Sequence, residues 1–204
     1  MKVNAGKITA FALCSLPFVW ALAATAGVAG QSLGANPIEK LLHHFGDWGL
    51  KLLLVTLAVT PARLVLKKPV IGRYRRMLGL FAFFYVLLHF LVYAALDQRL
   101  AWRPMLEDIV ERPYITIGIA ALLLMTPLAV TSTRGWMRRL GKRWGQLHKL
   151  VYAIAILGVW HFYWQVKQDV LEPLLHAAVL ALLLGYRLWH RQRRRPRRRA
   201  VAPG

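Results

Sequence analysis

Six apolar stretches alternate with short charged segments along this chain of 204 residues. They cover about residues 8–28, 48–66, 77–96, 113–130, 146–166 and 173–189. A hydrocarbon core about 30 Å thick requires roughly 20 mostly apolar residues of α-helix, so each stretch is close to the length of a membrane span. Hydrophobic residues make up 57% of the chain, a share that favours a membrane protein over a soluble domain. The pattern predicts an all-α integral membrane protein, with residues 1–190 forming one six-helix bundle.

The first apolar stretch follows Lys2 and Lys7 and resembles a secretory signal peptide. It is longer than the apolar region of about 7–15 residues that such peptides carry. We therefore expect it to remain in the protein as an uncleaved transmembrane helix.

The segments between the stretches read as loops. Segment 31–47 is polar, with Asn36-Pro37 as a turn signal, and we expect His43 and His44 within it to be interfacial histidines in contact with water. Segment 97–112 is a loop of mixed charge. The chain ends at residues 191–204 in RQRRRPRRRAVAPG, which is too charged to pack and is predicted to be a disordered tail.

Basic residues are concentrated on one side of this arrangement. The N-terminus, segments 67–76 and 134–143 and the tail are basic, whereas the other three connections are mixed or nearly neutral. By the positive-inside rule, the basic segments and both termini are predicted to be cytoplasmic. The tail residues can also bind anionic lipid headgroups, and tryptophans near the predicted span ends fit an interfacial belt in the lipid bilayer.

Composition also excludes several classes of protein. The formal net charge of +20 comes from short loops and a tail, not from a basic groove with interleaved aromatic residues, so no nucleic-acid partner is expected. The single cysteine, Cys14, lies in the first apolar stretch, which excludes a disulfide framework and a cysteine-based metal site. No Ser-His-Asp set, phosphate-binding loop or carboxylate pair is present, so we expect no catalytic residue.

The candidate chemistry lies in histidines inside the predicted spans. His89 lies about twelve residues into its span and His161 about fifteen into its own, and both spans run from the cytoplasm to the periplasm. Neutral imidazole binds iron well and is a poor lipid-facing group. Two imidazoles at matched depth predict a haem b with His89 and His161 as axial ligands near the periplasmic side. Such an iron has no open position, which suits electron transfer. A lone histidine can instead hydrogen-bond a neighbouring helix, and we expect that role for His176.

His148 lies near the cytoplasmic side of the same apolar stretch as His161, in WGQLHKLVYAIAILGVWHFYW at residues 144–164. We expect it to belong to a cytoplasmic-side site, so the chain would hold one haem or two. On one ideal helix a step of thirteen residues turns the side chain by about 220°, so the two histidines would not share a face. Three alternatives stay open: a second haem with an unusual other ligand, a share in the first site, or another role.

Two arginines occupy the positions where a partner ligand for His148 would lie. Arg76 and Arg75 are thirteen and fourteen residues before His89, and neither binds iron. We interpret them either as contacts for haem propionates or a quinone, or as ordinary positive-inside charges.

Several segments resemble one bacterial family. They are NPIEKLLHHFGDWGLKLLLVTLAVTPAR, RRMLGLFAFFYVLLHFLVY and ERPYITIGIAALLLMTPLAVTSTRGWMRRLGKRWGQLHKLVYAIAILGVWHFYWQVK. The likeness covers about residues 30–167 and includes loop sequences such as ERPYIT and TSTRGW, which hydrophobicity alone does not dictate. The chain resembles the MsrQ (YedZ) family, the haem-binding membrane subunits of bacterial periplasmic protein-methionine-sulfoxide reductases. More widely, it resembles ferric-reductase and NADPH-oxidase transmembrane domains.

The resemblance implies a b-type haem protein of the bacterial inner membrane. Such a protein takes electrons from quinones and passes them to a periplasmic molybdopterin subunit, MsrP, which repairs oxidised proteins. The family's haem histidines fall on His89, His148 and His161. The resemblance also implies FMN, which no motif here locates. Relative to the ferric-reductase pattern, the second histidine of span 77–96 is missing, with Arg75 or Arg76 in its place.

Two other functions are compatible with intramembrane histidines. A proton- or ion-conducting transporter would be colourless and would show an internal repeat with interrupted spans, and none is evident in the sequence beyond Thr-Pro near two span ends. A stand-alone ferric or cupric reductase would hold haem but need no protein partner. For a relay to a partner, we expect segments 31–47 and 97–112 to form the docking face.

Overall fold

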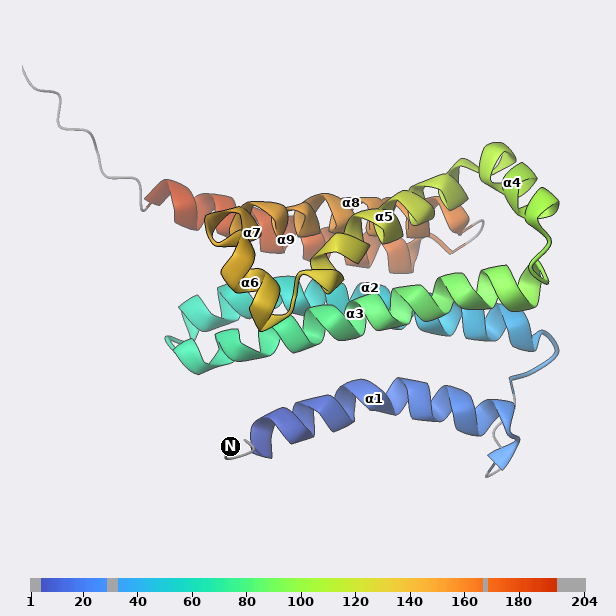
Figure 1. Cartoon of the computed structure of the whole chain (residues 1–204), viewed down its shortest axis with the longest axis horizontal. Coiled ribbons are helices and arrows are strands. Elements are labelled where there is room, and N and C mark those ends of the chain that lie inside the picture. Colours follow the sequence, from blue (N-terminus) through green and yellow to red (C-terminus); the bar gives the residue numbers. More distant parts are fainter. Residues whose placement is uncertain (1–4, 29–32, 167–168, 194–204) are drawn as a thin grey trace, which may run out of the picture.

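The computed structural model describes residues 5–28, 33–166 and 169–193, and the regular elements among them are all helices. The prediction of an all-α fold is therefore confirmed for these residues, whereas the predicted tail beyond residue 193 lies outside them. Six longer helices run side by side (Figure 1): α1 (Ala5–Thr25), α2 (Pro37–Val65), α3 (Arg75–Leu91), α5 (Pro113–Val130), α8 (Leu150–Gln165) and α9 (Leu171–Arg193). Short helical elements connect them: η2 (Pro69–Tyr74), η3 (Val92–Asp97), α4 (Trp102–Glu111), α6 (Arg134–Leu140) and α7 (Lys142–Leu147).

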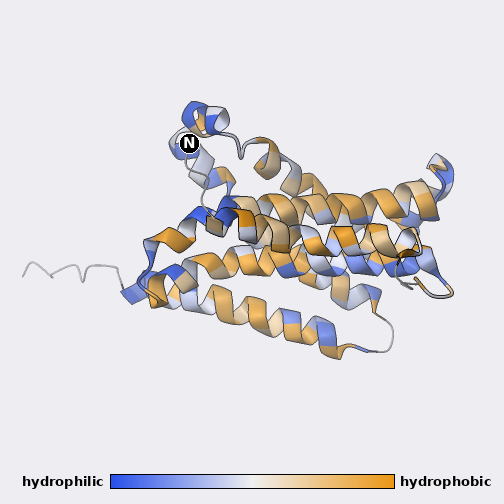
Figure 2. Cartoon of the chain, turned by 90° about the horizontal axis from the view of Figure 1, so that it is seen from below, coloured by the Kyte–Doolittle hydropathy of each residue, from blue (hydrophilic) through white to orange (hydrophobic). Residues whose placement is uncertain are grey.

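Five segments of the described chain are long and apolar enough to cross a membrane: Ala5–Thr25, Pro37–Val65, Pro69–Asp97, Pro113–Val130 and Leu171–Arg193. Helix α8 has 16 residues and is about 24 Å long at 1.5 Å per residue, a little short of a hydrocarbon core. Figure 2 shows apolar residues along the middle of the helices and hydrophilic residues gathered at their ends. The protein is a multi-pass membrane protein, and the count of six spans remains a prediction.

Four helices form a closed ring at the centre of the bundle. Helix α2 packs against α3 and α5 packs against α8 in the two most extensive interfaces, while α3 also contacts α5 and α2 contacts α8. The order around the ring is therefore α2, α3, α5, α8. Helices α3 and α8, which carry His89 and His161, consequently occupy diagonal positions and face each other across the interior.

Helix α9 is fixed to this ring by a partly buried cation. Arg187 donates to the backbone carbonyl of Leu57 at 2.5 Å and to the hydroxyl of Tyr152 at 3.0 Å. The Leu57 carbonyl lacks its usual helical donor because Pro61, four residues later, has no N–H. The proline that weakens α2 thus creates the acceptor that binds α9, a contact that sequence reasoning missed.

Helix α2 begins earlier than the sequence predicted. The side chain of Asn36 accepts a hydrogen bond from the Glu39 N–H at 3.3 Å, and Pro37 occupies the first turn. Asparagine followed by proline is a helix-start signal as well as a turn signal. The prediction of a polar connection over 31–47 was therefore wrong from residue 37 onward.

The predicted loop 97–112 also contains a helix, α4. Met105 is buried on one side of it, whereas Trp102, Leu106 and Val110 are exposed. These three residues recur every four positions and so share one helix face. The many charges of this segment concealed an amphipathic pattern, and the loop prediction was wrong.

The stretch 144–164 is not one continuous helix. Helix α7 ends at Leu147 and α8 begins at Leu150, because the Lys149 N–H bonds the carbonyl of Gln146, three residues back, at 3.1 Å. His148 lies in this turn. The angle of about 220° expected between His148 and His161 on one ideal helix therefore does not apply.

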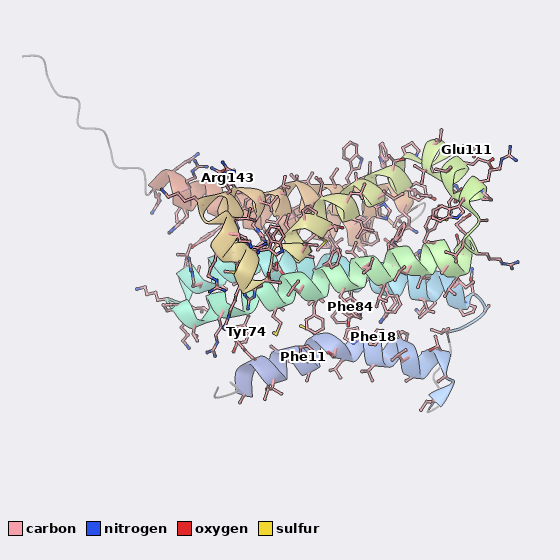
Figure 3. All side chains as sticks on the ribbon, viewed as in Figure 1. Phe11, Phe18, Tyr74, Phe84, Glu111 and Arg143 are labelled. Carbon is pink, nitrogen blue, oxygen red and sulfur yellow. The ribbon has the colours of Figure 1, made fainter. Side chains whose placement is uncertain are left out.

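Helix α1 is joined to α3 through a tyrosine inserted into its backbone. Tyr85, with 0% of its surface exposed, donates its hydroxyl hydrogen to the Cys14 carbonyl at 2.6 Å and accepts from the Phe18 N–H at 3.1 Å. A side chain that enters the i→i−4 ladder in this way bends a helix. Phe18 also packs edge-on against Phe84, with ring centroids 5.3 Å apart (Figure 3).

A histidine of α2 makes a second polar contact with α1. His44 Nε2 lies 2.9 Å from the carbonyl oxygen of Pro17, and its ring lies 4.5 Å from that of Trp20. The prediction of an interfacial histidine in water was wrong for His44, because α1 covers it.

We expect Tyr85→Phe to lower the free energy of unfolding by about 1 kcal/mol, the usual net value of such hydrogen bonds. Cys14 and Phe18 can then bond each other, but their link to α3 is lost. Thermal unfolding of the detergent-purified protein measures the change, with the exposed Tyr163→Phe as the matched control. An unfolding midpoint equal to that of the wild type would contradict the role given to Tyr85.

Candidate functional site

His89 and His161 meet in the interior of the four-helix ring. Their ring centroids are 6.0 Å apart and their planes are inclined by 81°. They come from α3 and α8, which the ring order places diagonally. The structure therefore brings together the two histidines that the sequence matched in depth.

Each of these imidazoles is held by a backbone carbonyl of the neighbouring helix. Nδ1 of His89 lies 2.9 Å from the Leu42 oxygen in α2, and Nδ1 of His161 lies 2.7 Å from the Tyr114 oxygen in α5. A carbonyl can only accept, so each Nδ1 carries the hydrogen and donates it. Nε2 of each ring is then unprotonated, which is the form that binds a metal.

The pair fits the iron of a haem. A bond between a metal and an imidazole nitrogen is about 2.0 Å long, so two rings bound on opposite sides of one ion have centroids about 6 Å apart. Two neutral imidazoles in apolar surroundings are a typical ligand set for haem iron in electron transfer. Among the described residues, no group of three or more His, Cys, Asp or Glu side chains could hold a metal ion.

The two imidazole–carbonyl pairs repeat at a fixed offset. His161 follows His89 by 72 residues, and Tyr114 follows Leu42 by the same number. In both pairs the histidine lies 47 residues after its acceptor. Helices α2–α3 and α5–α8 therefore hold their histidines with the same spacing. The sequence did not reveal this recurrence, because the spacing recurs while the residue types mostly do not.

His148 lies apart from this pair, beside a cavity of about 400 Å³. Its ring stacks on Trp144 with centroids 3.9 Å apart, and its Nδ1 lies 3.1 Å from the Trp144 carbonyl oxygen. Its Nε2 is buried and has no hydrogen-bond partner. His89 and His161 do not line the cavity, so His148 does not share their site.

The walls of this cavity combine apolar surface with cations. Basic side chains come from the start of α3, from η2 before it and from α1: Arg75, Arg76, Arg73 and Lys7. The remaining lining is mostly apolar and includes Leu53, Phe83, Met125 and Ile154. Arg76 Nη1 also lies 3.6 Å from the sulfur of Met137. The lining suits a flat apolar molecule that carries anionic groups, next to an imidazole nitrogen free to bind it.

Two tyrosines in the same predicted span as His89, each four residues from it, have other partners. Tyr85 bonds α1, and Tyr93 donates to a carboxylate oxygen of Asp108 at 3.3 Å. His43 Nε2 lies 2.8 Å from Gln165 Nε2, which links α2 to α8 at the end of the bundle. His176 bonds the carbonyl of Glu172 on its own helix, not a neighbouring helix as the sequence led us to expect.

Sequence reasoning missed the acceptors of the site, the carbonyl oxygens of Leu42 and Tyr114. Backbone atoms carry no residue signature, so the histidines alone did not indicate them. The available signal was the glycine one turn after each acceptor, Gly46 and Gly118, at the same offset of 72 residues.

Comparisons with known proteins identify the family of this chain. Residues 45–159 match the family model of the ferric reductase like transmembrane component. Three relatives carry the name protein-methionine-sulfoxide reductase heme-binding subunit MsrQ. The relative from Xanthomonas campestris pv. campestris strain 8004 is 53% identical over 174 residues, 85% of this chain and 80% of the relative. The relative from Rhodospirillum rubrum is 55% identical over 196 residues, which are 96% of this chain and 93% of the relative. The relative from Xanthomonas axonopodis pv. citri is 51% identical over 175 residues, which are 85% of this chain and 80% of the relative.

We expect His89→Ala and His161→Ala each to abolish the sharp α-band of the low-spin bis-histidine haem in a reduced-minus-oxidised absorption spectrum. Each variant removes one of the two iron ligands. His148→Ala should lower the ratio of haem to protein without removing that band, and His176→Ala serves as the control. A colourless wild-type protein, expressed with ample haem, would contradict the ligand assignment.

Proposed function

This chain belongs to the MsrQ family of haem-binding subunits of protein-methionine-sulfoxide reductases, and we propose from this membership how it works. It takes electrons from quinones in the bacterial inner membrane and delivers them to a periplasmic molybdopterin subunit, MsrP. That subunit reduces methionine sulfoxide in damaged proteins. The membrane subunit itself carries out no substrate chemistry.

The observation that carries the proposal is the facing pair of His89 and His161, each with its Nδ1 bonded to a carbonyl. A bound haem supplies reversible one-electron transfer between ferric and ferrous iron. The chain supplies two fixed imidazoles, and the hydrogen bond at each Nδ1 makes Nε2 a stronger donor. The apolar ring of helices around them limits access of water, which also influences the redox potential.

A second haem in the cavity beside His148 is the next part of the proposal. The unpartnered Nε2 of His148 would be its histidine ligand, and Arg75 and Arg76 would bind its propionates or an anionic group of a quinone. The 72-residue offset of the two histidine–carbonyl pairs supports a site with one histidine, since the position 72 before His148 is Arg76. FMN remains an expectation from the resemblance alone.

The acidic residues support an orientation for the bundle. All eight of the chain belong to the same end of it: Glu39, Asp47, Asp97, Glu107, Asp108, Glu111, Asp169 and Glu172. Figure 3 shows Glu111 at that end, and Arg143 and Tyr74 at the other. Since the opposite end holds an excess of Lys and Arg, we propose that it is cytoplasmic, together with both termini.

This orientation places α4 and the start of α2 on the periplasmic side. These elements occupy the segments 31–47 and 97–112, and we keep them as the proposed docking face for the partner subunit. His43 and Gln165 link α2 and α8 at the same end of the bundle, the end toward which the His89–His161 pair is placed.

A direct ferric or cupric reductase is the second candidate, because the matching family model is a ferric reductase like component. The names of the relatives favour the methionine-sulfoxide system.

Reconstitution in liposomes decides between them. We expect quinol-loaded liposomes with the wild-type protein to support reduction of a methionine-sulfoxide peptide only when MsrP is added, and His161→Ala to abolish it. His176→Ala is the control. Rapid reduction of chelated Fe³⁺ without MsrP, combined with no transfer to MsrP, would favour the direct reductase.

The orientation has its own test in cysteine labelling. With Cys14 replaced by Ser, we expect Glu111→Cys to react with a membrane-impermeant maleimide added to intact spheroplasts. Arg143→Cys should react only after the membrane is permeabilised, because the basic end faces the cytoplasm. The reverse pattern of labelling would contradict the proposed orientation.

A further inference from the structure

Two glycines lie directly beside the facing imidazoles. A Cβ atom added to Gly46 would lie 3.0 Å from Nδ1 of His89, and one added to Gly118 would lie 2.9 Å from both Nδ1 and Cε1 of His161. At each glycine, the three nearest atoms to this Cβ all belong to the imidazole. We call the spaces over Gly46 and Gly118 the glycine niches.

The niches follow from the geometry of an α-helix. Gly46 lies four residues after Leu42, and Gly118 lies four after Tyr114, so each glycine is one turn beyond the carbonyl that holds the histidine. Residues four apart are neighbours on the helix surface. An imidazole that bonds a carbonyl from the side must therefore lie over the next turn, where any side chain would displace it.

Close packing of helices does not explain these two glycines. Gly49 and Gly158 are of that kind, since their added Cβ atoms would meet aliphatic side chains, Val86 Cγ2 at 2.8 Å and Leu50 Cδ1 at 3.4 Å. Gly46 lies on the same helix as Gly49, but the three atoms nearest to its added Cβ all belong to the His89 ring. Gly46 and Gly118 are also 72 residues apart, the same offset that separates His89 from His161. The residue 72 after Gly49 is Ala121, so that glycine does not recur.

We infer that Gly46 and Gly118 are positioning residues for the haem ligands. Each niche keeps its imidazole against the helix, so that Nδ1–H donates to the carbonyl and Nε2 points away from it. Through this hydrogen bond the niche controls the donor strength of Nε2 and hence the midpoint potential of the iron. The inference rests on the proposed function, in that His89 and His161 bind a haem.

The first experiment measures midpoint potential and electron paramagnetic resonance on detergent-purified protein. We expect Gly46→Ala and Gly118→Ala each to shift the potential upward, because a displaced imidazole loses basicity and stabilises ferric iron less. They should also change the low-spin resonance and weaken haem retention about 10–100-fold, as loss of a second-shell partner typically does. Gly49→Ala, which crowds Val86, and Gly145→Ala, which meets no atom within 4 Å, should keep the wild-type potential and resonance.

A rescue experiment keeps the test informative if these alanine variants fold poorly. His161→Gly removes the ring that a methyl group at position 118 would strike, so His161→Gly and His161→Gly/Gly118→Ala should be equally stable. We expect free imidazole to restore the low-spin spectrum of the first variant, and to require at least about 10-fold more imidazole in the second, the lower end of a second-shell effect. His89→Gly, with and without Gly46→Ala, repeats the comparison.

The outcomes separate this inference from the proposed function. Wild-type potential and resonance in both alanine variants, or equal imidazole requirements with and without the Gly118→Ala substitution, would overturn the positioning role and leave the haem assignment intact. A shift in Gly49→Ala as large as in Gly46→Ala would also overturn it. A wild-type protein without haem would overturn both.

Discussion

The hydrogen bond from a buried imidazole to a helix carbonyl is the interaction on which the centre of this protein depends. An imidazole N–H without a partner is costly in an apolar bundle, and water is scarce there. The carbonyl of Leu42 or Tyr114 already accepts one bond within its helix, but a carbonyl oxygen has a second lone pair. That lone pair accepts the Nδ1–H hydrogen bond, which fixes the tautomer and orientation of each ring and leaves Nε2 free to bind a ligand. The register of α2 against α3, and of α5 against α8, is the one that lets this bond form twice.

The sequence predicted the features that depend only on the spacing of residues along the chain. The length of the apolar stretches gave an all-α membrane protein, and counting from the span ends placed His89 and His161 at one depth. It did not predict what depends on how two helices meet. The acceptors are backbone atoms, and the glycines beside them resemble packing glycines until the structure shows which atoms they face. The diagonal placement of α3 and α8 is likewise a property of the ring.

Two local errors share a cause, namely that polar residues were read as loop. Asn36-Pro37 starts a helix, and the charges of 97–112 belong to an amphipathic helix, α4. In both cases composition was read without capping or periodicity. The third error is the opposite one, because His148 lies in a turn where the apolar stretch was read as one continuous helix. The position of His148 is the most useful correction, because a turn directs its side chain independently of α8 and gives it a cavity of its own.

The tyrosine inserted into α1 has a consequence for how the protein is made. Tyr85 is 71 residues later in the chain than Cys14, its acceptor. When α1 first enters the bilayer during synthesis, the Phe18 N–H and the Cys14 carbonyl have only each other, and the helix closes its own ladder. Arrival of α3 then opens that turn and exchanges an internal bond for two bonds to a neighbour. We therefore expect the first helix to have one pattern of backbone hydrogen bonds before α3 docks and another afterwards.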